Sequence, residues 1–430
     1  MTRSHLLRSI SAMTVTSEDK NPPQYIIGFD VGGGTIRASL YKWHNGKLEK
    51  IMLPDLGDPN DLNNPAFTGI VVTNGVVKKL FRKGKANIID DIDEVTKYIQ
   101  SRSPEPISFI SLPIPCRLEG SGPAPTHDFE DPSFVVQQAN SGMDMAAPPS
   151  ECWGTNWEAE ITTRTGIAAN PLNDANTALL AHWYAALENG DIADTAIGWG
   201  LYVGAGTGFG ASAAQLGKQP RILHNAHMYD GMLALDSNDQ QALSEICIRS
   251  GITIVNHQLS EVAPDTIFVE RFPKLIENKP VFHLIHDQGK TYALSFQLFA
   301  ASSIQTLVGG TDLKQLTAAN AFGGHDSTLA LIGKYMGNFV KGFQQGTIQR
   351  VPSKDAPRFP KPSGDPATLK WVFLGGGAFS GDIGERIKGV TEAACPDVKF
   401  IRTNESKLDV CGAGARSTAQ QLQASRGRLS

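Results

Sequence analysis

The stretch 25–41 constrains the fold of this chain more than any other, because two strand patterns flank a run of glycines within it. The apolar run 25–29 has the length of a buried strand, and the alternation over 36–41 is typical of a second one. Gly32, Gly33 and Gly34 lie between them and, having no side chains, permit a tight turn. The sequence therefore predicts a strand, a tight turn and a second strand.

This first glycine turn is compatible with two interpretations. Successive exposed N–H groups, helped by the Thr35 hydroxyl, form a concave receptor for phosphate oxygens, and Asp30 beside them could hold a magnesium ion through water. An ordinary glycine-rich hairpin would show the same residues. Arg37 is a candidate phosphate partner or an exposed strand arginine. No helix follows the glycines and no Gly-Lys-Ser/Thr ending is present, which excludes Rossmann and Walker turns.

Length and composition limit the class of protein. A chain of 430 residues predicts two domains, and 41% hydrophobic with 19% charged residues is ordinary for a globular protein. A net charge of −4 and a pI near 6.2 leave no basic footprint, so nucleic acid and anionic membrane are not expected as partners. Five cysteines without a Cys-x-x-Cys pair indicate reduced thiols in a cytoplasmic protein.

Local patterns assign the rest of the chain. Residues 1–24 are expected to be a disordered extension, with a transit peptide or an initiator at Met13 as alternatives. The Pro-, Gly- and Asp-rich segment 119–149 predicts a long excursion, facing the substrate or closing over it. Helices are predicted over 85–102, 157–165, 171–187, 239–249, 329–346, 383–391 and 411–424, and further strands over 107–114, 197–203, 371–374 and 399–402.

The opening layout occurs again further along the chain. Strand 197–203 runs into a second glycine turn over 204–210, and strand 371–374 runs into a third at Gly375, Gly376 and Gly377. This repetition is typical of an internally duplicated α/β fold with one nucleotide cleft between its halves. We expect a smaller α/β domain over 25–180, completed by a C-terminal helix over 412–430, and a larger one over 181–411.

Four elements in fixed order carry a family resemblance. They are Asp30-x-Gly-Gly-Gly-Thr35, Asn173-Asp174, the turn 204–210 and Leu374-Gly375-Gly376-Gly377. Together they resemble the actin-like ATPase superfamily, with its ribonuclease H-like duplicated fold, and within it the glucokinases of the bacterial type. The resemblance runs from about residue 25 to 422, and its most specific parts are 201–208 and 398–422.

The resemblance implies ATP- and Mg²⁺-dependent phosphorylation of a hexose, glucose to glucose 6-phosphate in glycolysis. Asp174 matches the catalytic base, which takes the proton of a sugar hydroxyl, and Asn173 matches the asparagine that binds the sugar. Asp30 would face the metal. ATP would contact the three turns through Gly32, Gly33, Gly34 and Thr35, through Gly204, Gly206, Thr207 and Gly208, and through Gly375, Gly376 and Gly377.

The chain departs from the family at the sugar pocket. Glucokinases of this type have Glu-Gly-Gly-His after the second turn, where this chain has Tyr229-Asp230-Gly231-Met232. Asp230 and Glu245 are the candidates that would replace the missing sugar ligands, with His224 and His227 as further alternatives. The Cys-rich zinc motif of the related ROK sugar kinases is missing, so we expect no structural zinc of that kind.

Alternatives remain for both the motif and the protein. Asn173-Asp174 is also a residue pair that favours a helix N-cap. The whole chain could be a sugar or nucleotide sensor that kept the fold without the chemistry, or an actin-like chaperone or filament. The expected partner is a small sugar, with a homodimer possible.

Overall fold

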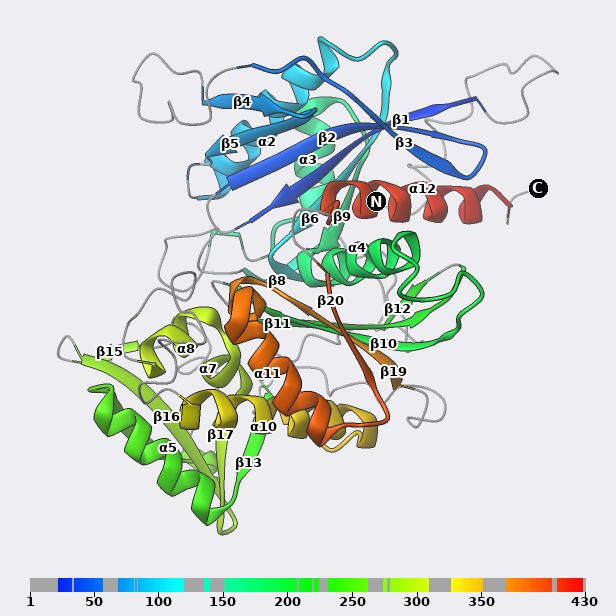
Figure 1. Cartoon of the computed structure of the whole chain (residues 1–430). Coiled ribbons are helices and arrows are strands. Elements are labelled where there is room, and N and C mark those ends of the chain that lie inside the picture. Colours follow the sequence, from blue (N-terminus) through cyan, green and yellow to red (C-terminus); the bar gives the residue numbers. More distant parts are fainter. Residues whose placement is uncertain are drawn as a thin grey trace. The chain divides into compact units, whose positions relative to one another are not determined.

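The computed structural model describes residues 22–32, 35–56, 69–80, 82, 84–119, 135–139, 151–152, 154–206, 209–218, 220–223, 231–261, 274–276, 279–308, 326–350, 369–403 and 408–427. These residues divide into two compact units (Figure 1). The first unit combines the chain up to 119 with 135–177 and the C-terminal residues from 409, and the second contains 178–408.

The first unit is built on a seven-stranded sheet. Its strand order is β4-β5-β2-β1-β6-β9, with β3 added to β2. Strand β1 pairs antiparallel with β2 and parallel with β6, and β6 pairs parallel with β9. A separate two-stranded sheet joins β7 to β8. The strands are β1 (Gln24–Val31), β2 (Thr35–His44), β3 (Lys47–Ile51), β4 (Ile70–Thr73), β5 (Val76–Leu80), β6 (Ile107–Ile114), β7 (Cys116–Glu119), β8 (Val135–Ala139) and β9 (Ala169–Asn173).

Helices cover both faces of this sheet. On one face, α2 (Lys85–Gln100) buries the apolar stripe that predicted it, and α3 (Trp157–Thr165) packs beside α2. The Asn156 side chain accepts a hydrogen bond from the Ala159 N–H at the start of α3, and Gly166 ends it in the left-handed conformation. On the other face, α12 (Val410–Gly427) packs on β1, β2 and β6.

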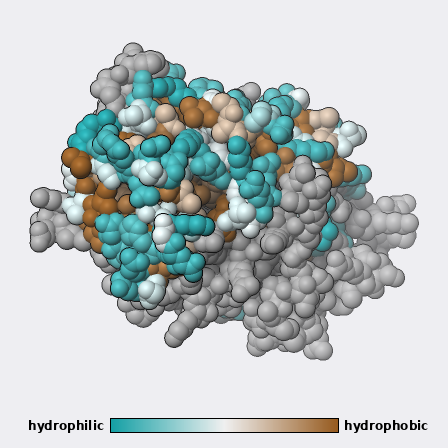
Figure 2. All heavy atoms as spheres, turned by 90° about the horizontal axis from the view of Figure 1, so that it is seen from below, coloured by the Kyte–Doolittle hydropathy of each residue, from teal (hydrophilic) through white to brown (hydrophobic). Residues whose placement is uncertain are grey.

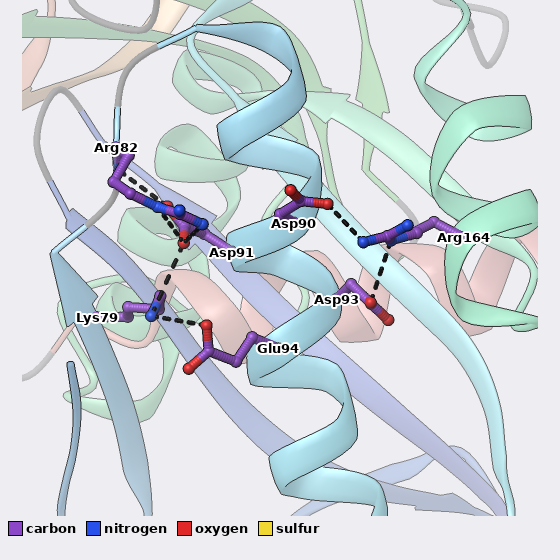
Figure 3. Close-up of polar contacts among 7 residues, drawn as sticks. All are labelled: Lys79, Arg82, Asp90, Asp91, Asp93, Glu94 and Arg164. Carbon is purple, nitrogen blue, oxygen red and sulfur yellow. Dashed lines mark hydrogen bonds and ion pairs between the residues drawn. The ribbon is translucent and has the colours of Figure 1, made fainter. Parts of the chain in front are cut away.

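An ion-pair network fastens α2 to its neighbours (Figure 3). Asp91 is fully buried and accepts hydrogen bonds from the Arg82 backbone N–H (2.8 Å) and guanidinium (2.9 Å). Lys79 of β5 lies 3.7 Å from Asp91. On the α3 side, Arg164 reaches Asp90 (2.6 Å) and Asp93 (3.2 Å). Charged residues therefore hold α2 to both β5 and α3.

The second unit contains two larger sheets. One has the order β12-β11-β10-β19-β20, and the other has the order β14-β16-β17-β13-β18, with β15 added to β16. The strands are β10 (Gly198–Ala205), β11 (Phe209–Leu216), β12 (Arg221–Ile222), β13 (Gly231–Leu235), β14 (Thr253–Gln258), β15 (Lys274–Ile276), β16 (Lys279–Asp287), β17 (Lys290–Leu294), β18 (Gln349–Arg350), β19 (Leu369–Gly375) and β20 (Lys399–Arg402).

The core of the second unit gathers between these sheets and their helices. Phe339 packs edge to face against Phe209 and Phe299 in this core, and those two rings are tilted by 59° to one another; the ring centroids are 5.2 to 5.7 Å apart. The helices are α4 (Asp174–Glu188), α5 (Ser237–Arg249), α7 (Ser295–Phe299), α8 (Ala301–Leu307), α10 (Asp326–Gln345) and α11 (Gly381–Ala394), with short 3₁₀ turns η1 (Leu259–Glu261) and η3 (Gly377–Phe379).

The two units repeat one topology, which confirms the predicted duplicated fold. The series β2-β1-β6-β9 and β11-β10-β19-β20 have the same order and directions, since each starts with an antiparallel hairpin and continues with two parallel strands. Each series also leads into a helix that joins the other unit: α4 follows β9, and α12 follows β20.

One predicted helix differs in its start. The helix expected over 171–187 begins at Asp174, because Ala169–Asn173 instead form β9 and pair with β6. Proline at 171 is compatible with this edge strand, because no other strand of the described residues pairs with it on its far side.

The segment predicted over 119–149 falls largely outside the described residues. The surface of the described part combines residues of both hydropathy classes. On the face shown in Figure 2, hydrophilic and hydrophobic residues are interspersed over the coloured atoms. Among the helices in the described part of the chain, none is long and apolar enough to cross a membrane.

Candidate active site

Asp30 lies at the end of β1, beside the first glycine turn. Across the hairpin it is in register with Arg37, whose Nη1 lies 3.4 Å from Asp30 Oδ2. Burial raises the pKa of Asp30, and the positive charge of Arg37 opposes this. The Asp30 side chain keeps 20% of its surface exposed, so a partly dry carboxylate faces the solvent at this edge.

Asp174 is the first residue of α4, directly after β9. Because β1, β6 and β9 are parallel, their carboxyl ends lie at one edge of the sheet, where open α/β sheets bind ligands. Burial raises the pKa of Asp174 to about 7; the hydrogen bond from the Ala175 N–H (2.8 Å) lowers it, and the negative charge of Asp30 raises it again. The two aspartates are therefore near enough to repel one another.

Asn173 uses its side chain inside the protein. Its Nδ2 donates to the Cys116 carbonyl (2.8 Å), and its Oδ1 accepts from the Asn176 N–H (3.1 Å). This is the helix-capping interaction that the sequence left as an alternative. The Asn173 side chain also hydrogen-bonds the Asp174 carboxyl and lowers its pKa. Sugar binding by Asn173 stays a prediction.

The first glycine turn is described only at its ends. The Gly32 N–H donates to the Thr35 carbonyl (3.0 Å), and Thr35 begins β2. Gly33 and Gly34 lie outside the described residues. The Gly32 N–H is thus engaged in closing the hairpin, and a phosphate receptor there would depend on the other N–H groups.

The second and third glycine turns lie side by side in the second unit. Gly204 of β10 pairs with Gly375 of β19, and a Cβ added to Gly376 would lie within 2.5 to 2.8 Å of the Ala205 carbonyl and the Gly206 nitrogen. The Gly206 carbonyl accepts a hydrogen bond from the Ala301 N–H (3.0 Å) at the start of α8. Thr207 and Gly208 lie outside the described residues.

The three glycines of the third turn differ in their surroundings. A Cβ at Gly375 or Gly376 would meet protein atoms within 3 Å, and Gly376 also has a positive φ of 86°. A Cβ at Gly377 would meet nothing within 4 Å, and its φ is ordinary. Packing among the described residues therefore requires the first two glycines and does not require Gly377, which borders open space.

Of the two sugar-binding candidates, Glu245 and Asp230, the structure describes only Glu245. Glu245 is exposed on α5, where its Oε1 accepts a hydrogen bond from Gln241 Nε2 (3.0 Å). Asp230, with His224 and His227, lies outside the described residues. Their roles remain predictions.

Metal binding at this site would depend on the carboxylates of Asp30 and Asp174. Within the described ranges, no three His, Cys, Asp or Glu side chains converge on a metal site. Magnesium does not require such a set, because it keeps several waters and takes one or two carboxylates together with substrate phosphates. The Asp30 carboxylate, with Asp174 nearby, fits this chemistry.

Two residues near the turns were missed by sequence reasoning. Tyr202 of β10 packs against Gly204 and Gly375, and His182 of α4 packs against Gly375. The only signal in the sequence is a tyrosine two positions before Gly204, which places both on one face of the strand.

Comparison with known proteins supports the fold. No protein-family model matches the chain, and no curated protein matches it. Among solved structures, the ROK hexokinase from Thermus thermophilus superposes with a TM-score of 0.50 at 15% identity, covering 93% of this chain and 100% of the hexokinase. The ROK family glucokinase from Streptomyces griseus in complex with glucose and AMPPNP gives 0.45 at 12% identity (92% and 99% covered), and the glucokinase from Balamuthia mandrillaris gives 0.46 at 10% (97% and 99%).

The duplicated sheets and the match to the Thermus hexokinase define the class: the chain has the actin-like ATPase fold, as its four motifs predicted. Within that class, the solved structures above are sugar kinases of the glucokinase and hexokinase type. At 15% identity or less this likeness establishes the fold, and activity has to be argued from the site.

Proposed function

We propose that this protein transfers the γ-phosphoryl group of ATP to a hydroxyl of a hexose, with glucose the favoured substrate and Asp174 as the general base. The observation that carries the proposal is the partly buried Asp174 carboxyl, whose pKa is raised to about 7 at the ligand-binding edge of its sheet. A base works best when its pKa lies near the working pH, because it is then both ionised and basic enough to take a proton.

Each residue has a definite part in the transfer. Ionised Asp174 accepts the proton of the sugar hydroxyl as the sugar oxygen forms its bond to the γ-phosphorus. The bond from that phosphorus to the β,γ-bridging oxygen breaks, and ADP leaves with the electron pair. When bound, Mg²⁺ would neutralise charge on the phosphates, and Asp30 is the residue that would hold it through water.

The glycine turns suit the nucleotide. Gly376 brings the main chain of the third turn close to Gly206 of the second, and Gly377 beside it borders open space, so a phosphate or a ribose can approach main-chain N–H groups there. The solved ROK glucokinase with AMPPNP binds a nucleotide of this kind. The two hairpins differ at one equivalent position. The first hairpin pairs Asp30 with Arg37, whereas the second pairs Gly204 with Gly210 and so carries no charge there.

The test is a coupled ADP-release assay over a panel of hexoses. We expect sugar-stimulated turnover in the wild type and a loss of at least about 10²-fold in kcat in Asp174→Ala. Exposed Asp194 on the loop after α4, changed to Ala, is the matched control and should leave turnover unchanged. An absence of sugar-stimulated turnover would contradict the proposal, as would full turnover in Asp174→Ala.

The sensor alternative is favoured by one observation, the missing Glu-Gly-Gly-His at 229–232. A sensor would bind glucose or ADP in a calorimeter without transferring phosphate. The raised pKa of the Asp174 carboxyl argues against a sensor. Burying a charged group costs stability, and a protein that transfers no phosphate gains no catalysis in return.

A further inference from the structure

The helices that follow equivalent strands approach their sheets differently in the two units. Aligning the hairpins at their closing pairs, Val31 with Ile36 and Ala205 with Phe209, makes Gly28 of β1 equivalent to Tyr202 of β10. At Gly28 the helix α12 comes so close that the Cys411 carbonyl occupies the space of an absent Cβ. At the equivalent position in the second unit stands the large ring of Tyr202.

The Tyr202 ring lies over the bases of two glycine turns. Its hydroxyl would be 2.5 Å from a Cβ at Gly204 and 2.8 Å from a Cβ at Gly375. These two glycines are directly paired across β10 and β19, and the ring covers both. Their lack of side chains is thus explained by Tyr202, in contrast to the open space at Gly377.

His182 of α4 lies against the same ring. The two ring centroids are 5.4 Å apart, His182 also packs on Phe373 at 6.1 Å, and its Nε2 would be 2.8 Å from a Cβ at Gly375. Only 1% of His182 is exposed, and burial lowers its pKa to about 4, so the imidazole is neutral at physiological pH. A neutral ring in a dry aromatic stack acts here as a fixed spacer between α4 and the sheet.

We propose that Tyr202, held in place by His182, is a positioning residue that fixes Gly204 and Gly375, where the second and third glycine turns begin, in the arrangement that binds the nucleotide. This inference rests on the proposed function, since it assigns ATP to these turns. Tyr202 acts through the turn backbone: without the ring, Gly204 and Gly375 lose the surface on which they rest, and the N–H groups beyond them lose their spacing. When the N–H donors of a binding site are displaced, they no longer match the positions of the ligand's acceptors, and both binding and catalysis weaken.

The experiment uses the full chain, with calorimetric binding of MgADP and steady-state KM for ATP and for glucose. In Tyr202→Leu we expect the Kd for MgADP and the KM for ATP to rise at least about tenfold, with KM for glucose within about twofold of wild type. Tyr202→Phe keeps the ring and should bind as the wild type does. Tyr292→Leu removes a tyrosine of similar burial from β17 and is the control for a general loss of packing.

A second-site test isolates the contact itself. Gly204→Ala places a methyl group against the Tyr202 ring and should weaken nucleotide binding by itself. In the Tyr202→Leu background the hydroxyl oxygen and the two ring atoms nearest that methyl are gone, so the double variant should bind no worse than Tyr202→Leu alone.

The outcomes separate the two proposals. Wild-type protein that binds neither MgADP nor ATP would overturn the proposed function and this inference with it. Wild-type binding with an unchanged Kd in Tyr202→Leu would overturn the inference alone, even if Tyr202→Leu unfolds at lower temperature. Equal losses in Tyr202→Phe and Tyr202→Leu, or additive losses in the double variant, would also overturn it.

Discussion

Replacing Asp174 with asparagine should make the protein more stable while abolishing the activity proposed for it. The reason lies in the carboxyl's pKa, which is 3.8 in an unperturbed aspartate and about 7 in the folded chain. A folded state that binds a proton more tightly than the unfolded state loses stability as the pH rises between these two values. Below about pH 4 both states are protonated and the penalty vanishes; above pH 7 both are ionised and it is complete.

The size of the effect follows from the shift. Each pKa unit corresponds to about 1.4 kcal/mol, so the full shift corresponds to about 4 kcal/mol. Since part of the Asp174 side chain remains accessible to solvent, which screens its charge, we expect about half of this, about 2 kcal/mol. Asparagine is close in shape and retains an oxygen to accept the Ala175 N–H, so the variant avoids the penalty without leaving a cavity.

The assay is thermal unfolding of wild type and Asp174→Asn, followed from pH 4 to pH 8. The variant should match the wild type near pH 4 and exceed it by several degrees at pH 8, because about 1 kcal/mol moves the midpoint by about 2–4 °C in a domain of this size. Exposed Asp194→Asn should show no such pH-dependent gain. A variant that is equally or less stable at pH 8, or a difference that does not change with pH, would refute the reasoning.

Three further predictions concern other parts of the chain. Gly377→Ala and the control Gly389→Ala both place a methyl group in open space, so neither should lower the unfolding midpoint. Only Gly377→Ala should weaken MgADP binding in a calorimeter. Unchanged binding would contradict the proposal that the nucleotide occupies the space beside Gly377. Arg37→Ala removes the charge that opposes the effect of burial on Asp30, so the pKa of the Asp30 carboxyl should rise, as followed by an NMR titration of that carboxyl; an unchanged pKa would contradict it. Asp91→Ala empties the fully buried centre of the network in Figure 3 and should cost about 1–3 kcal/mol in urea unfolding, whereas Asp90→Ala breaks an exposed pair and should cost less than about 1 kcal/mol; equal costs would show that burial does not matter there.

Around the candidate active site, the sequence predicted the strands next to the glycine turns correctly. The strands on either side of the first turn, and the strands before the second and third turns, all occur where the apolar patterns placed them. The pattern failed at Pro171, where the helix that was expected gives way to β9. Pairing with β6, residues far away in sequence, decides that strand, and a local pattern contains no information about a distant partner.

For individual side chains, too, the sequence revealed candidate residues but not their tertiary contacts. The sequence identified Asp30 as a candidate carboxyl because it stands at the end of an apolar strand pattern, and Asp174 because Asn173-Asp174 matches the family motif. It did not reveal that Asn173 spends two hydrogen bonds on the Cys116 carbonyl and the Asn176 N–H, since neither partner can be read from spacing alone.

The sequence by itself determined that this chain is a duplicated α/β protein with three glycine turns and an Asn-Asp pair, because hydrophobic periodicity and glycine are local signals of backbone conformation. Only the tertiary structure decided which glycines serve packing and which borders open space. It also decided that the two aspartates repel one another, and that Tyr202 stands where the other unit has a glycine. These properties depend on the register between strands and on the distance between helix and sheet, and both are set by the whole core rather than by any one segment.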